Sequence, residues 1–447
     1  MRAIRIGAGA GFSGDRIEPA VELAEKGSLD YLVFECLAER TIALAQLARR
    51  QDPSAGYDTL LEARMRAVLP ACRDRGVRIV SNMGAANPRA AARRVAQIAR
   101  ELGQQGLKVA AVTGDDVLEL ALAENPPLLA GTGRLCDLGT DRILSANAYL
   151  GADGVVEALA NGADVVIAGR VADPALFLGP LVHEFGWARD DWAMLAAGVL
   201  VGHLLECAGQ LSGGYFADPG VKPVADLARL GFPFAQVSAD GSAVVGKAAG
   251  SGGRIDLRTV KEQLLYELAD PSSYLTPDVT ADFSAVRMEQ VGPDAVALSG
   301  ARGRAAPDRL KVSVGYLDGF AGEGQIAYAG AQAVERGRLA LEIVEQRLAL
   351  TGVAVDELRR ELIGVDAILV GAPGHALSTP GEVRARIAAR CATLQAAQAI
   401  GAEVEALYTN GPAGGGGVTR SASPIVAIAS ALLPRARIRP QVELEVA

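Results

Sequence analysis

Histidine and cysteine are scarce in this chain of 447 residues, which has three histidines and five cysteines. Three histidines are too few for a multi-histidine metal centre, because such a centre uses several imidazoles on one ion. The cysteines are scattered without C-x-x-C spacing, so the sequence predicts neither a disulfide framework nor a zinc knuckle. Carboxylates, arginine, asparagine and serine must therefore supply most of any chemistry, and a reducing cytoplasm is the simplest location.

The chain also lacks an excess of positive charge and a long apolar run. Its net charge is -8 and its pI is about 5.2, so we expect no broad basic surface and no nucleic-acid partner. The apolar stretch 192–202 is too short to span a bilayer, and the N-terminus has no signal-type apolar core. We expect a cytoplasmic protein with no membrane partner.

Glycine and apolar residues are abundant. Half of the chain is hydrophobic (50%), which predicts a globular protein with a large core, and the length suggests two or three domains. The 52 glycines predict many tight turns, which favours a site built from loops.

Short apolar strands alternate with helical stretches in the first half of the chain. The predicted strands are 31–35, 77–81, 108–113, 142–146 and 164–168. This alternation predicts an α/β fold with a mostly parallel sheet and helices on both faces. A doubly wound sheet is preferred and a barrel is the alternative. We assign residues 1–215 to this α/β domain with its glycine-rich loop.

The pattern changes after residue 215. A hairpin over 235–247, turning at Asp240-Gly241, predicts an antiparallel insertion and connecting segment over 216–300. The last third predicts strands at 310–316, 325–328, 365–370 and 404–408, and helices at 332–350 and 383–400. This order predicts a C-terminal α+β domain over 301–447 with a second glycine-rich loop.

A glycine loop after the first predicted strand is the clearest sign of a ligand site. A strand at 3–6, a loop at 7–14, a helix at 15–26 and a second strand ending at Glu35 form one unit. Such a unit gathers backbone NH groups and a helix N-terminus around one point, which suits a phosphate or a carboxylate.

Residues 9–14 of this loop match the dinucleotide pattern G-x-G-x-x-G. Glu35 follows about 20 residues later, where a ribose-binding carboxylate would lie. However, Ser13, Asp15 and Arg16 make the turn polar, and Asp15 would repel a pyrophosphate unless it caps the helix. Nicotinamide binding is therefore an alternative and not the preferred interpretation.

Polar residues follow each predicted strand, at the edge where parallel sheets bind ligands. Glu35 is the preferred general base, because a desolvated carboxyl has a raised pKa. The alternative is a capping or ion-paired Glu35, with Arg40 as partner. After the predicted strand 164–168, Arg170 would bind a substrate carboxylate and Asp173 would orient it. In the alternative interpretation, Arg170 and Asp173 pair with each other and Asp173 caps a helix.

Two acidic groups are weak candidates for a metal. Asp115 and Asp116 are adjacent carboxylates that could hold Mg²⁺ or share a proton, but capping of the following helix is the better interpretation. His203 and Glu206 lie one helical turn apart, which suits a metal or an acid/base pair; a buried structural histidine is the alternative. The metal requirement stays open between Mg²⁺ and none.

A second glycine-rich loop covers residues 410–420, between a predicted strand and an apolar stretch. It has no Gly-Lys-Ser/Thr ending, so it is not a Walker loop, although Arg420 could bind a carboxylate or phosphate. The alternative is a flexible surface loop. The full set of predicted substrate-binding residues is Gly11, Ser13, Gly14, Asp15, Asn82, Asn147, Asn410, Gly414, Gly415, Gly416 and Arg420.

The chain resembles the acyclic terpene utilisation family, AtuA type. The resemblance is carried by residues 7–16, 30–40, 82–88, 169–174 and 206–220. It implies a cytoplasmic catabolic protein linked to the breakdown of branched acyclic terpenoids and related acids, without fixing the reaction. Larger relatives carry an additional small C-terminal domain, which implies a separate small partner subunit here. We also expect a homo-oligomer.

The leading hypothesis is an enzyme of hydro-lyase or isomerase type. It would abstract a proton next to a carbonyl in a small branched carboxylic acid or its CoA thioester, with Glu35 as base. Arg170 and Arg420 would hold the anion, and the two glycine loops would stabilise the developing oxyanion. The alternatives are an NAD(P)-dependent oxidoreductase and a non-catalytic subunit of an acyl-CoA-processing complex.

Overall fold

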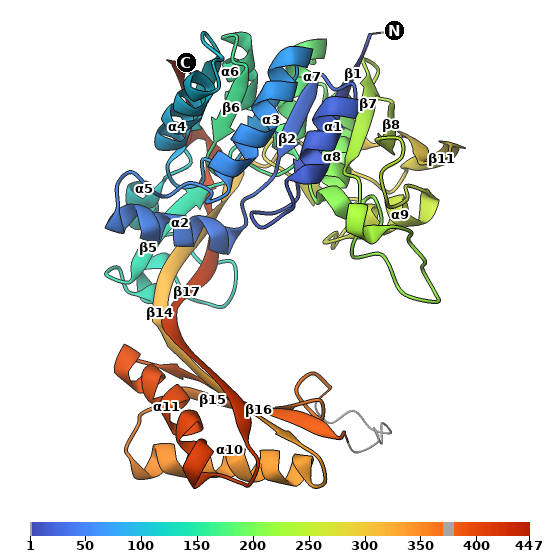
Figure 1. The fold of residues 1–447 in the computed structure, drawn as a ribbon. Coiled ribbons are helices and arrows are strands. Elements are labelled where there is room, and N and C mark those ends of the chain that lie inside the picture. Colours follow the sequence, from blue (N-terminus) through green and yellow to red (C-terminus); the bar gives the residue numbers. More distant parts are fainter. Residues whose placement is uncertain (1, 370–379) are drawn as a thin grey trace. The chain divides into compact units, whose positions relative to one another are not determined.

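The computed structural model describes residues 2–369 and 380–447 and has a mixed α/β fold (Figure 1). Contacts group the chain into two compact units. The first comprises Met1–Gly315 and Ile428–Ala447, and the second comprises Tyr316–Ala427. The three segments suggested by the sequence, 1–215, 216–300 and 301–447, remain a prediction of domain organisation.

A ten-stranded mixed sheet forms the centre of the first unit. Its parallel part contains, in spatial order, β1 (Ala3–Ala10), β2 (Tyr31–Phe34), β3 (Arg78–Ser81), β6 (Val165–Ala168) and β4 (Lys108–Thr113). Antiparallel strands flank it: β7 (Pro233–Ser238), β8 (Ala243–Lys247), β12 (Ala295–Ser299) and β11 (Arg287–Gly292) beside β1, and β18 (Gln441–Val446) beside β4. Strands β7 and β8 confirm the predicted hairpin over 235–247.

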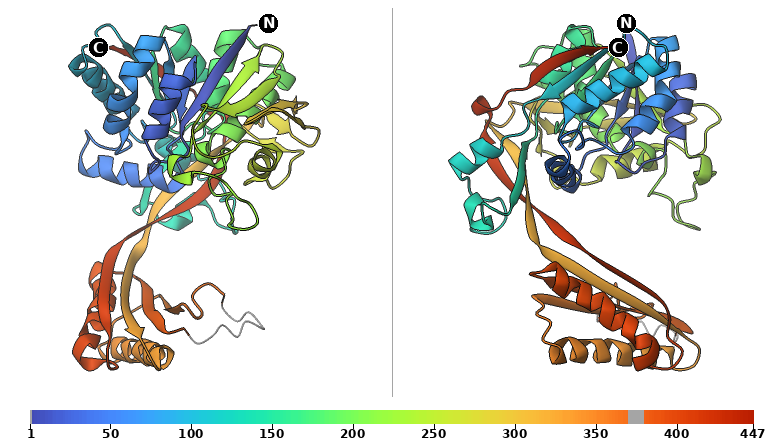
Figure 2. Two further views of the ribbon diagram at one scale, coloured as in Figure 1. Left: turned by 45° about the vertical axis from the view of Figure 1, so that its right-hand side comes forward. Right: turned by 60° about the vertical axis from the view of Figure 1, so that its left-hand side comes forward.

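Helices pack on this sheet in two layers, which can be followed in Figure 1 and in the turned views of Figure 2. One layer contains α1 (Glu18–Lys26), α3 (Leu61–Arg75) and α4 (Pro88–Glu101), and the other contains α6 (Asp153–Ala160), α7 (Ala175–Phe185) and α8 (Trp192–Leu205). Both α1 and α7 contact β1. Every residue of β2 and β6 is buried, as expected for strands that are covered on both faces.

The first unit also has smaller elements. They are α2 (Glu39–Gln51), α5 (Leu118–Glu124), β5 (Ile143–Ala148), α9 (Leu257–Leu265), β9 (Tyr274–Leu275), β10 (Thr280–Asp282), β13 (Arg302–Arg304) and the 3-10 turns Leu135–Leu138, Ala208–Gln210, Leu227–Arg229 and Arg435–Arg437. The strand predicted at 142–146 exists as β5, but it pairs with β14 and does not join the parallel sheet. No helix in the described part of the chain is both long and apolar enough to cross a membrane.

The second unit combines a sheet with two helices. The strand order is β15 (Glu357–Ile363), β16 (Glu382–Cys391), β14 (Arg309–Ala329) and β17 (Gly416–Pro434), and the helices are α10 (Ala333–Leu350) and α11 (Leu394–Asn410). The long strands β14 and β17 each have residues in both units. Side chains from α10, α11 and β16, among them Val344, Ile387 and Val404, form its buried core.

Of the elements predicted for the last third, the strands 310–316 and 325–328 and the helix 332–350 are confirmed, by β14 and α10, whereas the other elements differ from the structure. The predicted helix 383–400 begins with a strand, β16, in which every second residue from Val383 to Cys391 is buried. The predicted strand 404–408 lies inside α11, and the predicted strands 310–316 and 325–328 are parts of the single strand β14. Residues 365–369 form turns and a bend, and residue 370 lies outside the described residues.

Candidate functional site

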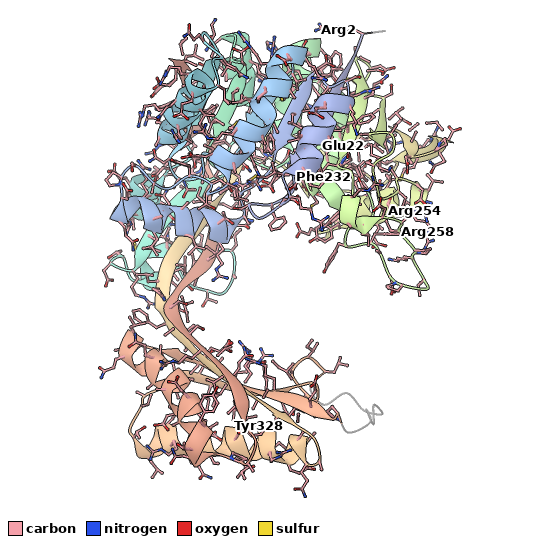
Figure 3. All side chains as sticks on the ribbon, viewed as in Figure 1. Arg2, Glu22, Phe232, Arg254, Arg258 and Tyr328 are labelled. Atoms are coloured by element: carbon pink, nitrogen blue, oxygen red, sulfur yellow. The ribbon has the colours of Figure 1, made fainter. Side chains whose placement is uncertain are left out.

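A cavity of about 870 Å³ lies at the carboxyl ends of β1, β2 and β6 in the first unit. Ligands of parallel α/β sheets bind at this edge. Eight of the candidate site residues singled out from the sequence line it: Gly11, Ser13, Asp15, Glu35, Arg170, Asp173, His203 and Glu206. Residues that the sequence did not single out complete the lining, including Phe232, which is labelled in Figure 3.

The first glycine loop begins later than predicted, because β1 continues to Ala10. Gly7 and Gly9 therefore belong to a buried strand. A Cβ on Gly7 would lie 2.7 Å from Leu23 Cδ2 of α1, and one on Gly9 would lie 2.7 Å from Phe34 Cε1. These two glycines allow close packing of the strand, and the residues available to a ligand start at Gly11.

The turn after β1 is filled by its own carboxylate. Asp15 Oδ2 accepts a hydrogen bond from Gly11 N at 2.9 Å, and Asp15 Oδ1 accepts one from Arg16 N at 2.8 Å. Asp15 does not cap α1, whose N-cap residue is Ile17 and has no side-chain cap. Because a carboxylate already occupies these amides, the turn does not resemble a cradle for a pyrophosphate.

A buried arginine, Arg64, binds the backbone of the turn after β1. Arg64 of α3 is fully buried; its Nη1 lies 3.1 Å from Asp58 Oδ1, and its Nη2 donates to the carbonyls of Phe12, Ser13 and Asp15 at 2.8–3.3 Å. Ser13 Oγ donates to Asp58 Oδ2 at 2.7 Å. Sequence reasoning missed Arg64, although its position on the apolar face of a helix was a usable signal.

Glu35 lies at the end of β2 with only 7% of its surface exposed. Its Oε1 accepts hydrogen bonds from Leu37 N at 2.8 Å and from Asn82 Nδ2 at 3.0 Å. Burial, together with the nearby carboxylate of Asp173, raises the pKa of Glu35 to about 8. The predicted site residue Asn82 is fully buried and also accepts from Cys36 N, so it holds the Glu35 strand end in place.

Arg170 and Asp173 pair with each other, as one of the two interpretations predicted. Nη2 of Arg170 binds Asp173 Oδ1, Nη1 donates to the carbonyl of Leu37, and Nε donates to the carbonyl of Val171 at 2.9 Å. The guanidinium also stacks 4.4 Å from the ring centre of Tyr149. Pro174 is the N-cap residue of α7 without a side-chain cap, so Asp173 does not cap that helix.

Asp115 is a second buried carboxyl, in contact with the backbone of Arg170. Its Oδ2 accepts from Arg170 N at 3.0 Å and from Asn147 Nδ2 at 2.9 Å, and burial raises its pKa to about 6. Asp116 is exposed and accepts from Leu118 N at 3.4 Å, at the start of α5. Among the described residues, no group of three or more histidine, cysteine or carboxylate side chains could hold a metal ion.

His203 and Glu206 form a dyad at the end of α8 and line the cavity. His203 Nδ1 lies 3.0 Å from Glu206 Oε1, and Nε2 lies 3.0 Å from the carbonyl of Leu264. Because a carbonyl only accepts, Nε2 carries a proton and the second proton is shared between Nδ1 and Glu206. Burial raises the pKa of Glu206 to about 7. The dyad can therefore give or take one proton near neutral pH.

The second glycine-rich segment lies in the second unit. It follows α11 and not a strand, and Asn410 is the last residue of that helix, with Nδ2 donating to the carbonyl of Ala406 at 3.0 Å. Gly416 and Arg420 belong to β17, and Arg420 Nη1 pairs with Glu405 Oε2 at 3.1 Å. Gly414 and Gly415 lie in the turn between helix and strand. Their predicted role in substrate binding stays a prediction.

Gly11→Ala is expected to destabilise the protein by about 1–3 kcal/mol, since the new methyl group would lie 2.5 Å from the carbonyl carbon of Cys207 and the backbone would have to shift. Thermal or denaturant unfolding measures the loss. Gly14→Ala is the matched control, because its Cβ meets only the exposed ring of Phe12. Equal stability of the two variants would contradict the close approach at Gly11.

Comparison with known proteins gave one match. A family model described as acyclic terpene utilisation family protein AtuA matches residues 4–444, nearly the whole chain. This span contains every residue that lines the cavity. Searches of curated proteins and of solved structures found no match.

Proposed function

Because the chain belongs to the acyclic terpene utilisation family AtuA, and so to the catabolism of acyclic terpenes, we propose that it is an enzyme that removes a proton next to a carbonyl group. The substrate would be a small branched carboxylic acid or its CoA thioester. The reaction would be that of a hydro-lyase or an isomerase, with Glu35 as the general base.

The observation that carries this proposal is the environment of Glu35. Its carboxyl lines the cavity, is nearly buried, and is held by hydrogen bonds to Oε1 from Leu37 N and Asn82 Nδ2. General bases work best when their pKa lies near the working pH, and the pKa of Glu35 is about 8. An ordinary exposed glutamate would be too weak a base for this task.

The His203–Glu206 dyad supplies a second proton-transfer group in the same cavity. In a hydro-lyase, Glu35 takes the proton as the C–H bond breaks and its electron pair forms the double bond. The dyad gives its proton to the departing hydroxyl, which leaves as water. In an isomerase, the dyad returns a proton to a different carbon. Both reactions need one base and one acid, which these two groups provide.

We also propose that the parallel sheet is of the doubly wound type. Support comes from the helix layers on both faces and from the path of the chain, which passes from β3 to β4 and returns to β6 between them. Such a reversal moves the connecting helices to the other face, because crossover connections are right-handed. The cavity lies at the carboxyl edge where such sheets bind ligands.

The pH dependence of proton exchange tests the proposal. In D₂O, the protein should catalyse deuterium incorporation next to the carbonyl of a branched acyl thioester, detected by NMR. The base acts only when ionised, so kcat/KM should rise with pH and level off above about pH 8. A rate that falls as pH rises through this range would contradict the assignment of Glu35 as base.

A further inference from the structure

Arginine and lysine side chains line the cavity of the first unit at three positions, and the protein neutralises two of them. Arg170 is buried and pairs with Asp173. Lys311 Nζ binds Glu39 Oε1 at 2.9 Å. The third is Arg16, which is exposed and forms no ion pair in the described part of the chain. Of the three, Arg16 therefore keeps a charge that a ligand can use.

One nitrogen of the Arg16 guanidinium fixes this side chain to the protein. Nη1 donates to the carbonyls of Leu227 and Ala228 at 3.1 and 3.3 Å, in a 3-10 turn whose Leu227 also lines the cavity. Both acceptors are neutral, so they orient the guanidinium without pairing its charge. The carboxylate of the preceding residue, Asp15, binds the backbone amides of Gly11 and Arg16 and not the guanidinium.

The two other nitrogens of Arg16, Nε and Nη2, form the fork with which arginine binds anions. They have no hydrogen-bond partner among the described residues. Elsewhere in the protein, Arg94 uses the same two nitrogens to bind both oxygens of Glu62, at 2.7 and 2.6 Å. Such paired hydrogen bonds match the geometry of a carboxylate or a phosphate. Arg16 therefore presents a free anion-binding fork at the cavity.

The exposure of Arg16 distinguishes it from the proton-transfer groups of the cavity. Glu35 is 7% exposed and His203 is 1% exposed, whereas Arg16 lies in contact with solvent, at the rim. A substrate that loses a proton to Glu35 must bring its carbonyl group to the buried part of the cavity. A free acid carries its charge on that same carbonyl group. A CoA thioester instead has a neutral carbonyl, and its phosphates lie at the other end of the pantetheine arm.

Exposed aromatic side chains are a second feature of the lining. Phe12 and Tyr215 line the cavity and are 59% and 86% exposed. Tyr215 also has a φ of 61°, a left-handed conformation that is unfavourable for a residue with a side chain and that occurs often at ligand sites. Flat apolar surfaces that reach solvent suit the adenine ring or the pantetheine arm of CoA better than a small acid.

We infer that Arg16 binds a phosphate group of an acyl-CoA at the rim of the cavity. The inference rests on the proposed function, and it chooses the CoA thioester from the two substrate forms that this function leaves open. Arg16 contributes to binding and specificity and takes no part in the proton transfer at Glu35. The acyl group and its carbonyl occupy the buried part of the cavity, while the charged end of the same ligand stays at the rim.

Calorimetric titration of the full chain at neutral pH tests the inference with two ligands that share one acyl group. They are 3-methylbutanoyl-CoA and the N-acetylcysteamine thioester of the same acid, which has no phosphate. Arg16→Gln should raise the Kd of the CoA thioester about ten-fold, because hydrogen bonds between charged groups are lost, and leave that of the N-acetylcysteamine thioester unchanged. An unchanged Kd of the CoA thioester, or an equal loss for both ligands, would overturn the inference.

Arg229→Gln is the matched control. Arg229 is exposed and belongs to the turn that Arg16 binds, but it pairs with Asp226 at 2.6 Å and does not line the cavity. Its removal should change the Kd of the CoA thioester by less than about two-fold. Arg16→Lys keeps the charge without the fork and should recover part of the affinity. Equal effects of Arg229→Gln and Arg16→Gln would indicate a general effect of charge and overturn the inference.

Titration with 3-methylbutanoate distinguishes the two possible sources of the anion. If Arg16→Gln weakens binding of this free acid and spares the CoA thioester, Arg16 holds a carboxylate and the inference is wrong. The proposed function fails by a different result. If Arg16→Gln weakens only the CoA thioester but deuterium exchange proceeds without Glu35, the phosphate site stands and the proposed reaction is wrong.

Discussion

Glu35→Gln is expected to lower kcat by about 10²–10⁴-fold, the usual contribution of a general base, while KM changes little. Glutamine has the shape of glutamate, and its Oε1 can keep both hydrogen bonds, from Leu37 N and Asn82 Nδ2. Only the ability to take a proton is lost. Initial rates of deuterium exchange or turnover at saturating substrate measure the effect.

The same variant is expected to be more stable than the natural protein above neutral pH. The pKa of Glu35 is about 8 in the folded state and about 4.5 in a free chain, so the folded state holds its proton more tightly. Stability of the natural protein therefore falls as pH rises from about 4.5 to about 8, because the unfolded state releases the proton more readily. Glutamine has no such proton, and the difference in Tm should grow over this window.

Glu62→Gln is the matched control for both measurements. Glu62 is partly exposed, pairs with Arg94 and does not line the cavity, so its removal should leave kcat and the pH dependence of Tm nearly unchanged. Full activity of Glu35→Gln would reject Glu35 as the base. A loss of activity accompanied by a lower Tm would instead indicate damage to the fold.

Arg64→Met is expected to destabilise the protein by about 3–5 kcal/mol, which is the usual result of removing one partner of a buried ion pair. Methionine keeps the apolar contacts of α3 but leaves the buried Asp58 carboxylate without its cation. It also removes the Nη2 donor from the carbonyls of Ser13, Phe12 and Asp15, of which the Phe12 carbonyl keeps its hydrogen bond from Asp15 N. Denaturant unfolding measures the loss.

Arg66→Met on the same helix is the control, since the Arg66–Glu101 pair is exposed and should contribute less than about 1 kcal/mol. Adding Asp58→Asn to Arg64→Met should recover part of the stability, because the unpaired buried charge disappears. Equal effects of Arg64→Met and Arg66→Met would contradict the role of Arg64 as the anchor of the turn.

Secondary structure was predicted more accurately in the parallel sheet of the first unit than in the second unit. The strands β2, β3, β4 and β6 are short apolar runs bounded by turns, and they were predicted within a residue or two. Over β16 the sequence predicted a helix, because the arginines and alanines there suit one, whereas the structure has a strand in which buried residues alternate with partly buried ones from Val383 to Cys391. Pairing with β14 and β15 decided the outcome.

In the candidate site too, the sequence predicted some residues and missed others. Glu35, Arg170 and Asp173 were predicted because each follows a parallel strand, and strand order alone brings such residues to one edge. His203 and Glu206 were also singled out, from their spacing of one helical turn, but only the fold brings them to the same cavity as Glu35. Arg64 was missed, because the carbonyls of the first turn that it binds come from a segment distant in the sequence.

The amino-acid pattern was sufficient for the α/β class, the family and the edge of the sheet where the cavity lies, because these depend on local periodicity and short motifs. The tertiary structure decided the charge state of the cavity. The raised pKa of Glu35 comes from burial, and the engagement of Arg170 comes from the carbonyls of Leu37 and Val171 that packing brings to it. Burial and hydrogen-bond partners are properties of packing, and no stretch of the chain carries them alone.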